Sequence, residues 1–162
     1  MIKLTTSKGD ILIELDEEKA PVSCSNFRQY VEDGHYDGTI FHRVINSFMI
    51  QVGAFKTHIM QKGTREHIEN EARNGLKNEA GNIAMARTMD PHSATAQFFI
   101  NVSNNNFLDY PGQDGWGYAV FGKVTEGMDV ISAIKGVETT HRGGHSDVPV
   151  EPIVIEKAEI VD

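Results

Sequence analysis

The chain has 162 residues, of which 40% are hydrophobic, and it carries a formal net charge of −8. This length and composition are typical of a single globular domain over residues 1–162 and argue against intrinsic disorder. The acidic balance argues against nucleic acid or an anionic membrane surface as a partner, and no apolar run approaches the roughly 20 residues that cross a bilayer.

The cysteine content and the first residues bear on the compartment. Cys24 is the only cysteine, so the chain cannot form an internal disulfide. The first seven residues lack the basic region and apolar stretch of a signal peptide. We therefore expect a cytoplasmic protein.

Two strands and a helix are predicted at the N-terminus. Apolar residues alternate with polar ones over residues 2–6 and 11–15, and residues 8–10 supply the turn of a hairpin. Pro21 suits the first turn of a helix, and Gly34 supplies a left-handed stop. Phe27 and Val31 lie at helical spacing between them, so this helix is expected to pack on a sheet.

The rest of the chain alternates between short strands and loops. A second helix is predicted from about residue 126 to 135, with Gly136 behind it. Residues 56–82 are polar and poorly periodic, which predicts mostly loop; so long a loop is typical of a functional role. Strands are predicted at residues 39–45, 48–53, 83–86, 97–102, 118–124 and 152–161.

About eight strands and two helices, without a βαβ rhythm, indicate a mainly β protein. Short strands at this spacing favour a closed eight-stranded antiparallel β-barrel, because closure removes exposed sheet edges. The two α-helices would cap the ends of the barrel.

The common catalytic motifs are absent from the sequence. It contains no GxSxG, no glycine-rich phosphate loop, no HExxH and no CxxC. His141 and His145 lie close together, but a zinc site normally needs three or four ligands, so a loop with surface histidines is the better interpretation. Cys24 lies on the presumed buried face of the first helix and is interpreted as a small buried hydrophobe rather than a nucleophile.

Four other segments are distinctive. Residues 41–51, FHRVINSFMIQ, resemble the FHRxIxxFMxQ signature of cyclophilins. Residues 93–100 are similar to that family's SQFFI strand, residues 118–124 to its VFGKV strand, and residues 107–109 to its WLD element. The resemblance covers nearly the whole chain in order, and it is closest to the bacterial cytoplasmic branch of these peptidyl-prolyl cis-trans isomerases.

This resemblance implies a capped eight-stranded barrel with a peptide groove on its outer face, and an activity that accelerates rotation about X–Pro bonds. It implies that Arg43 is the catalytic residue and that Gln51 binds the peptide and supports Arg43, while Gln97 holds the groove wall. Ala86 and Arg87 would present backbone to the substrate. The pocket for the proline ring would be formed by Phe48, Met49, Phe99 and Leu108, with Phe107 and Tyr118 on the far rim.

Each of these residues also has a structural interpretation. The four pocket residues could be barrel core, because apolar residues on strands usually are. Arg43 is harder to explain that way, since an arginine within an apolar strand must be paired or face a cleft. A proline-peptide binding module or holdase remains the alternative function, and Arg43 favours the enzyme over it.

The resemblance further implies no metal or cofactor, a monomer, and proline-containing peptides and unfolded or partly folded proteins as partners. The sequence departs from the family pattern at Val52, which we expect to tighten or reshape the groove floor, and at Ala54. Phe107 replaces a rim tryptophan, so we expect weak binding of the cyclic peptide cyclosporin. Trp116, within the extended stretch of residues 109–117, has no assigned role.

Overall fold

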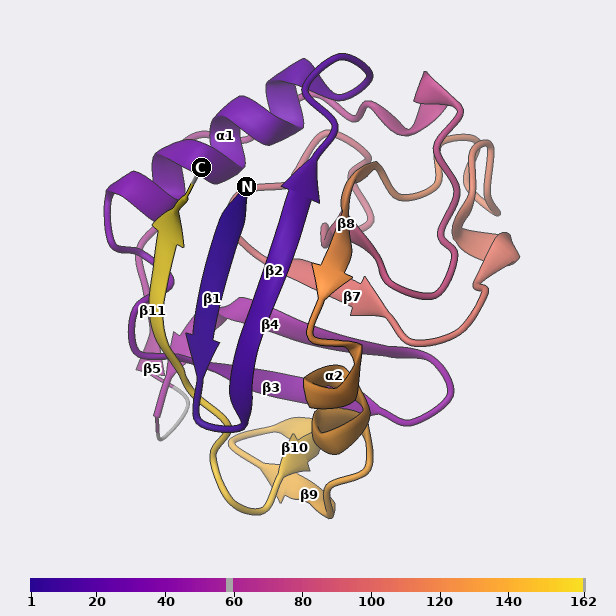
Figure 1. Ribbon diagram of the computed structural model, residues 1–162. Helices are drawn as coiled ribbons and strands as arrows, with labels where there is room; N and C mark the ends of the chain where they lie inside the picture. The colour runs from indigo at the N-terminus through magenta and orange to yellow at the C-terminus, as the bar shows by residue number, and fades with distance from the viewer. Residues whose placement is uncertain (58–59, 162) are drawn as a thin grey trace.

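One antiparallel sheet curls into a nearly closed barrel of eight strands (Figure 1). The strands follow the order β11–β1–β2–β8–β6–β7–β4–β3 around the barrel, and β5 pairs with β4 off this path. The computed structural model describes residues 1–57 and 60–161. Within this part the strands of the barrel are β1 (Ile2–Thr6), β2 (Gly9–Leu15), β3 (Thr39–Ile45), β4 (Met49–Lys56), β6 (Asn82–Met85), β7 (Phe98–Asn101), β8 (Val120–Glu126) and β11 (Ile155–Ile160).

The barrel closes where β3 meets the segment that leads into β11. Ile40 forms an isolated antiparallel bridge with Val154. The backbone N–H of Phe41 donates to the carbonyl oxygen of Ile153 at 3.0 Å, and that of Gly38 donates to Ile155 at 2.7 Å. These bonds satisfy edge groups that an open sheet would expose. The predicted fold class, a closed eight-stranded antiparallel barrel with two helices, is confirmed.

The hydrophobic core fills the barrel and continues under both helices. Helix α1 (Pro21–Glu32) lies at one end and helix α2 (Met128–Lys135) at the other (Figure 1). Phe27 of α1 packs within 5.2 Å of the rings of Phe98 and Phe121, measured between centroids. Ile131 and Ile134 of α2 belong to the same buried cluster. The two helices therefore cap the barrel, as predicted.

The N-terminal hairpin and the first helix confirm the sequence prediction. Residues of β1 and β2 alternate between the core and the surface, and Ile2, Leu4, Ile11 and Ile13 are fully buried. Proline occupies the first position of α1, where a missing N–H costs no hydrogen bond. Gly34 follows the helix with φ of 72°, the left-handed conformation expected of its stop.

Other boundaries differ from the prediction. Helix α2 begins at Met128, because β8 extends to Glu126 and Gly127 turns the chain with φ of 104°. The stretch of residues 56–82 is mostly loop, as predicted, and also contains β5 (Met60–Gln61) and the 3-10 helix η1 (Ala72–Asn74). His58 and Ile59, within the same prediction, lie outside the described residues.

A short hairpin was not predicted. Strands β9 (Thr139–Arg142) and β10 (His145–Pro149) pair with each other in a separate two-stranded sheet. The expectation of a loop in this segment is therefore wrong, whereas the histidines lie at the surface as expected, with His141 exposed and His145 partly exposed. Its residues are mostly polar and partly exposed, so the sequence carries no apolar alternation that would mark strands.

Cys24 is fully buried on α1. Its Sγ donates to the carbonyl oxygen of Phe121 at 3.3 Å. Burial, together with the nearby charges of Glu17 and Glu71, raises the pKa of the thiol to about 12, so it stays protonated at neutral pH. The interpretation of Cys24 as a small buried hydrophobe is confirmed.

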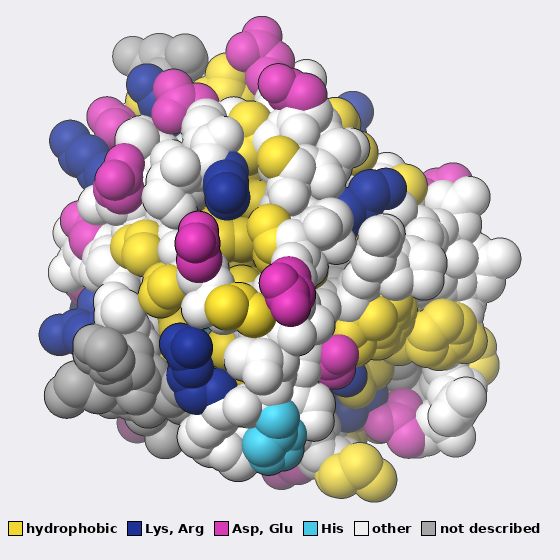
Figure 2. All heavy atoms as spheres, turned by 90° about the horizontal axis from the view of Figure 1, so that it is seen from below, with side chains coloured by type: hydrophobic (Ala, Val, Ile, Leu, Met, Phe, Trp, Pro, Cys, Tyr) yellow, Lys and Arg dark blue, Asp and Glu magenta, His cyan; other side chains and the backbone are white. Residues whose placement is uncertain are grey.

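The surface carries both signs of charge. On the face drawn in Figure 2, acidic and basic side chains are interspersed with one another and with apolar side chains. Within the described residues, no helix is long and apolar enough to cross a membrane.

Candidate active site

A groove of about 590 Å³ lies on the outside of the barrel. It is lined by Met49, Phe99 and Leu108, which belong to a small apolar cluster that is separate from the barrel core and also contains Ala84 and Val120. Successive residues of a strand point to opposite faces, so on β7 Phe98 and Ile100 enter the core while Phe99 enters the groove. The alternative that the predicted pocket residues are barrel core is therefore wrong, although three of them are buried.

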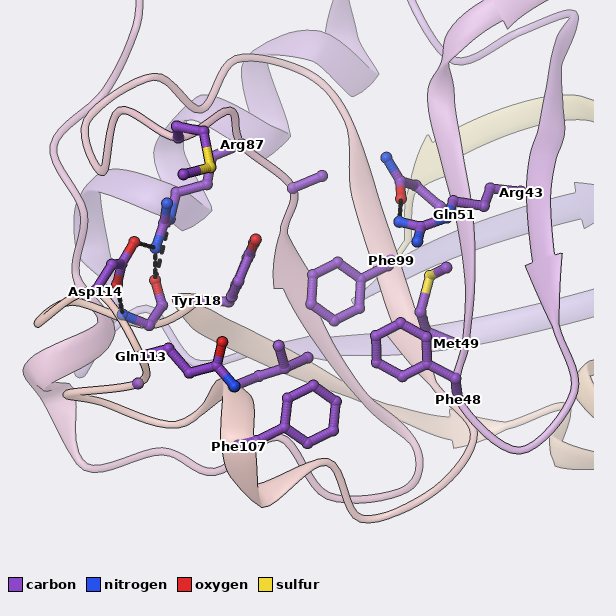
Figure 3. Close-up of a pocket in the computed structure, with 15 residues that line it drawn as sticks. Arg43, Phe48, Met49, Gln51, Arg87, Phe99, Phe107, Gln113, Asp114 and Tyr118 are labelled. Carbon is purple, nitrogen blue, oxygen red and sulfur yellow. Dashed lines mark hydrogen bonds and ion pairs between the residues drawn. The ribbon is translucent and has the colours of Figure 1, made fainter. Parts of the chain in front are cut away.

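Aromatic side chains form the walls of the groove (Figure 3). Phe107, on the 3-10 helix η2 (Asn106–Leu108), stacks on Phe48 with ring centroids 5.6 Å apart and is 54% exposed. Tyr118 meets Phe99 edge to face at 5.8 Å. Met49 and Leu108 lie beside these rings, and all the predicted pocket and rim residues line the groove.

Arg43 stands at the edge of this pocket and is exposed to solvent. A register shift between Phe41 and Arg43 interrupts the pairing of β3 with β4, and such a bulge re-aims side chains. The guanidinium Nη1 donates to Oε1 of Gln51 at 3.5 Å. Nε2 of Gln51 in turn donates to Oε1 of Gln97 at 2.8 Å. Gln97 thus holds the side chain of Gln51 in place through this hydrogen bond. Gln97 itself does not line the groove.

Ala86 and Arg87 border the groove on another side, next to Tyr118. The backbone N–H of Ala86 already donates to the carbonyl oxygen of Gln97 at 3.0 Å. The side chain of Arg87 is only 4% exposed and forms an ion pair with Asp114 at 2.7 Å. Its guanidinium also lies 4.5 Å from the centroid of the Tyr118 ring. The sequence resemblance implied a backbone role for Arg87, and it did not anticipate this buried side chain.

Several residues that line the groove were missed by sequence reasoning. Met89, which is 91% exposed, stands at the rim. Four more come from residues 109–117: Gly112, Gln113, Asp114 and Gly117. The only available signal was the unusual length of that stretch. Trp116 belongs to the same stretch but does not line the groove; its ring lies 4.6 Å from that of His92 and 5.9 Å from the guanidinium of Arg73.

A buried network of asparagines supports the groove from behind. Asn105 Nδ2 donates to the carbonyl oxygen of Phe48 at 2.9 Å and to Oδ1 of Asn101 at 2.7 Å. Asn101 Nδ2 donates to Oδ1 of Asn78 at 3.1 Å. The backbone N–H of Asn78 donates to Oδ1 of Asp109 at 2.6 Å. The network therefore joins β7 to the segments that carry Phe48, Phe107 and Leu108.

The departure at Val52 does not affect the groove. Val52 is fully buried and belongs to the barrel core, so the expectation that it reshapes the groove floor is wrong. Its neighbour Gly53 has φ of 107°, and a Cβ there would lie 2.9 Å from Cε1 of Tyr36. Ala54 lines a neighbouring hollow, together with Gln51 and Gln97.

Two histidines meet on the other side of Arg43. The ring of His42 lies 4.7 Å from that of Phe55 and 6.1 Å from that of His145, between centroids. Burial, with the charges of His145 and Arg43, lowers the pKa of His42 to about 4, so its imidazole is neutral at pH 7. Within residues 1–57 and 60–161, no three His, Cys, Asp or Glu side chains are grouped as metal ligands.

The chain matches the family described as cyclophilin type peptidyl-prolyl cis-trans isomerase/CLD over residues 1–160. It is 59% identical over 162 residues to a peptidyl-prolyl cis-trans isomerase of Streptomyces antibioticus, covering 99% of this chain and 98% of the relative. It is 54% identical over 162 residues to peptidyl-prolyl cis-trans isomerase B of Escherichia coli K12, covering 99% of each.

Solved structures give the same result for the fold. The crystal structure of a cyclophilin type peptidyl-prolyl cis-trans isomerase of Cryptosporidium parvum, in the presence of the dipeptide Ala-Pro, superposes with a TM-score of 0.80. The two chains are 25% identical, and the match covers 99% of this chain and 98% of the other. A cyclophilin of Hirschia baltica matches with a TM-score of 0.75 at 25% identity, covering 98% of this chain and 72% of that one.

Proposed function

This chain belongs to the family of cyclophilin-type peptidyl-prolyl cis-trans isomerases, and from that premise we propose that the groove beside Arg43 is where it catalyses rotation about X–Pro bonds. The observation that carries this proposal is the position of Arg43. Its guanidinium stands at the edge of an apolar pocket of suitable shape for a proline ring, and Gln51 orients it.

The reaction requires a group that recognises a twisted amide. The planar amide resists rotation with a barrier of about 18–20 kcal/mol, because the nitrogen lone pair is delocalised into the carbonyl. When the bond twists, the lone pair returns to the nitrogen, which becomes a hydrogen-bond acceptor. A fixed guanidinium that donates to this nitrogen binds the twisted state more tightly than the planar one and so lowers the barrier. Arginine suits this role because it is always charged and its donors lie in a rigid plane.

The remaining site residues act on the substrate in other ways. The proline ring would be held in the pocket while the carbonyl end turns, so that reaction begins from an oriented complex. Gln51 would bind the peptide and hold Arg43, with Gln97 bracing it, and Ala86 and Arg87 would border the bound peptide chain. The pocket residues in this scheme are Phe48, Met49, Phe99 and Leu108, with Phe107 and Tyr118 on the rim.

We propose proline-containing peptides and unfolded or partly folded proteins as substrates. The structure of the C. parvum relative in the presence of Ala-Pro supports a proline-peptide ligand. The pairing of β1 with β11 at opposite ends of the sequence supports one domain over residues 1–162. The net charge of −8 favours peptide over nucleic acid or membrane partners, and the lone buried cysteine supports a cytoplasmic location.

Exchange NMR on a short X–Pro peptide tests the proposal without a coupled protease. Catalytic amounts of the protein should accelerate cis-trans interconversion, and the Arg43→Ala variant should lose most of that acceleration while its spectrum stays folded. Binding of the peptide without acceleration by the native chain would instead favour the alternative of a proline-peptide binding module.

A further inference from the structure

The loop of residues 109–117 forms one side of the groove, facing Arg43 across the proline pocket (Figure 3). Asp109 belongs to the asparagine network described above, and none of the roles in substrate binding or catalysis assigned above involves a residue of this loop. The loop brings Gln113 and Asp114 to the groove surface beside Phe107 and Tyr118.

Arg87 fixes this loop in place. Its Nε and Nη2 both donate to the carbonyl oxygen of Gly117, at 3.1 and 2.8 Å. Nη2 also donates to Oδ2 of Asp114 at 2.7 Å, and Nη1 donates to the carbonyl oxygen of Thr88 at 3.0 Å. The planar face of the guanidinium covers the ring of Tyr118. A buried arginine with all three nitrogens engaged is a rigid anchor.

Asp114 is committed to the structure of the loop. Its Oδ2 accepts from Arg87, and its Oδ1 accepts from the backbone N–H groups of Trp116 and Gly117, both at 3.1 Å. The hydrogen bond from Arg87, followed by those two backbone bonds, lowers the pKa of this carboxyl to about 2. Both carboxylate oxygens of Asp114 thus accept hydrogen bonds that hold the loop together.

Both ends of the loop are also anchored. Oδ1 of Asp109 accepts from the backbone N–H and from Nδ2 of Asn78, at 2.6 and 3.1 Å. At the other end Gly117 has φ of 76°, and a Cβ there would lie 2.6 Å from the carbonyl oxygen of Leu108. Only glycine permits so close an approach of the two ends. The loop is therefore a rigid wall of the groove.

Gln113 is the polar side chain of this wall that remains for a ligand. It is exposed, lines the groove, and has no hydrogen-bond partner among the residues that the structure describes. In Figure 3 its amide lies between Phe107 and Tyr118, on the opposite side of the pocket from Arg43. An amide can both donate and accept, which matches the N–H and C=O of a peptide group.

We propose that Gln113 is a substrate-binding residue whose amide hydrogen-bonds the peptide group that follows the proline, and that Arg87 is the positioning residue that holds it there. This inference rests on the proposed function, because it takes Arg43 to face the imide nitrogen that joins the proline to the preceding residue. The proposal also takes the chain that follows the proline to leave the pocket on the side of Gln113, opposite Arg43. Recognition through the backbone makes this contact independent of the side chain that follows.

The contact acts on binding rather than on rotation. The peptide group after the proline does not twist during the reaction, so Gln113 binds the ground state and the transition state equally. An interaction of that kind lowers KM and leaves kcat unchanged. A hydrogen bond of ordinary net strength corresponds to a change of about 2- to 12-fold in KM.

Gln113→Ala, assayed by exchange NMR over a range of peptide concentrations, tests the contact. On Ala-Ala-Pro-Ala amide we expect KM to rise about 2- to 12-fold with kcat unchanged. On the matched peptide with an ester after the proline, which lacks the N–H and has a weaker carbonyl acceptor, the rise should be less than about 2-fold. Gln29→Ala, the same truncation on the exposed face of α1, should change neither constant. An unchanged KM, an equal rise on the ester peptide, or a fall in kcat would overturn the proposal.

The role of Arg87 is tested by combining variants. Arg87→Met should raise KM as Gln113→Ala does, and adding Gln113→Ala to it should have little further effect. Asp114→Ala, which removes the ion-pair partner of Arg87 together with the acceptor of the Trp116 and Gly117 backbone N–H groups, should show the same non-additivity and decides the matter if the arginine variant does not fold. If Gln113→Ala raises KM as much in the Arg87→Met and Asp114→Ala variants as it does in the native chain, the positioning role is refuted. Failure of the proposed function itself is distinct, since the native chain would then accelerate neither peptide.

Discussion

Replacing Asn101 by alanine should destabilise the protein far more than its small size suggests. Asn101 is fully buried at the end of β7. Its Nδ2 donates to Oδ1 of Asn78 at 3.1 Å and to the carbonyl oxygen of Asn82 at 3.0 Å. Its Oδ1 accepts from Nδ2 of Asn105 at 2.7 Å.

The size of this loss in stability follows from the polar groups that lose their hydrogen-bond partner. Without the amide, the acceptors on Asn78 and Asn82 lose these bonds, whereas Asn105 keeps its bond to Phe48. A buried polar group without a partner costs about 1–3 kcal/mol. We therefore expect Asn101→Ala to lower the free energy of unfolding by about 2–4 kcal/mol, part of the cost being relieved if water enters the vacated space.

Asn104→Ala is the matched control, because the same residue type three positions later is exposed. Its Oδ1 accepts from the backbone N–H of Ala80 at 3.0 Å, and water can replace that bond. The control should lose less than about 1 kcal/mol. Urea denaturation of both variants at pH 7, followed by the fluorescence of the single tryptophan, measures the difference. Equal losses for the two variants would refute the view that the buried network holds the groove segments together.

Three further predictions follow from the site. A tryptophan supplies an N–H donor and more apolar surface than Phe107. Cyclosporin should therefore inhibit the native protein weakly and the Phe107→Trp variant about 10-fold or more tightly. Inhibition titrations of both forms decide this, and tight inhibition of the native protein would contradict it. Because rotation about a C–N bond breaks no covalent bond and needs no Lewis acid, isomerase activity should survive EDTA; loss of activity that zinc restores would contradict this. The pKa of His42 is 6.5 in the unfolded chain and about 4 in the folded one, so the unfolded state binds a proton at a higher pH than the folded state does. The free energy of unfolding should therefore decline by up to about 3 kcal/mol as the pH falls from 6.5 to 4. His42→Phe should remove that part of the decline in urea titrations at pH 7 and pH 4, and an identical decline in both proteins would show that His42 is not its source.

The barrel and the proline pocket could be predicted because both leave a local signal. Alternation over β1 and β2 marks strands with one buried face, and Pro21 and Gly34 mark the ends of a helix. Pattern alone could not distinguish core from pocket at Met49 or Phe99, since both faces of these strands are apolar. The family resemblance made that distinction, and the structure shows its physical basis in a second apolar cluster outside the barrel.

The supporting parts of the site could not be predicted because they depend on contacts between distant segments. Asn78 and Asn101 are separated by 23 positions, and Arg87 and Asp114 by 27. Neither pair forms a recognisable motif, and a buried arginine cannot be told from an exposed one in a polar stretch. The hairpin of β9 and β10 was missed for a related reason, since its strands are polar and lie outside the main sheet.

The most direct test of the central claim is to separate turnover from binding in the Arg43→Ala variant. Peptide Kd from NMR titration and kcat from exchange spectroscopy can be measured on the same samples, with Gln29→Ala as the control. If the guanidinium acts on the twisted amide, kcat should fall about 100-fold or more, as when a single transition-state donor is removed, while Kd changes less than about 3-fold. A folded variant with near-normal kcat, or one whose whole loss lies in Kd, would contradict the mechanism.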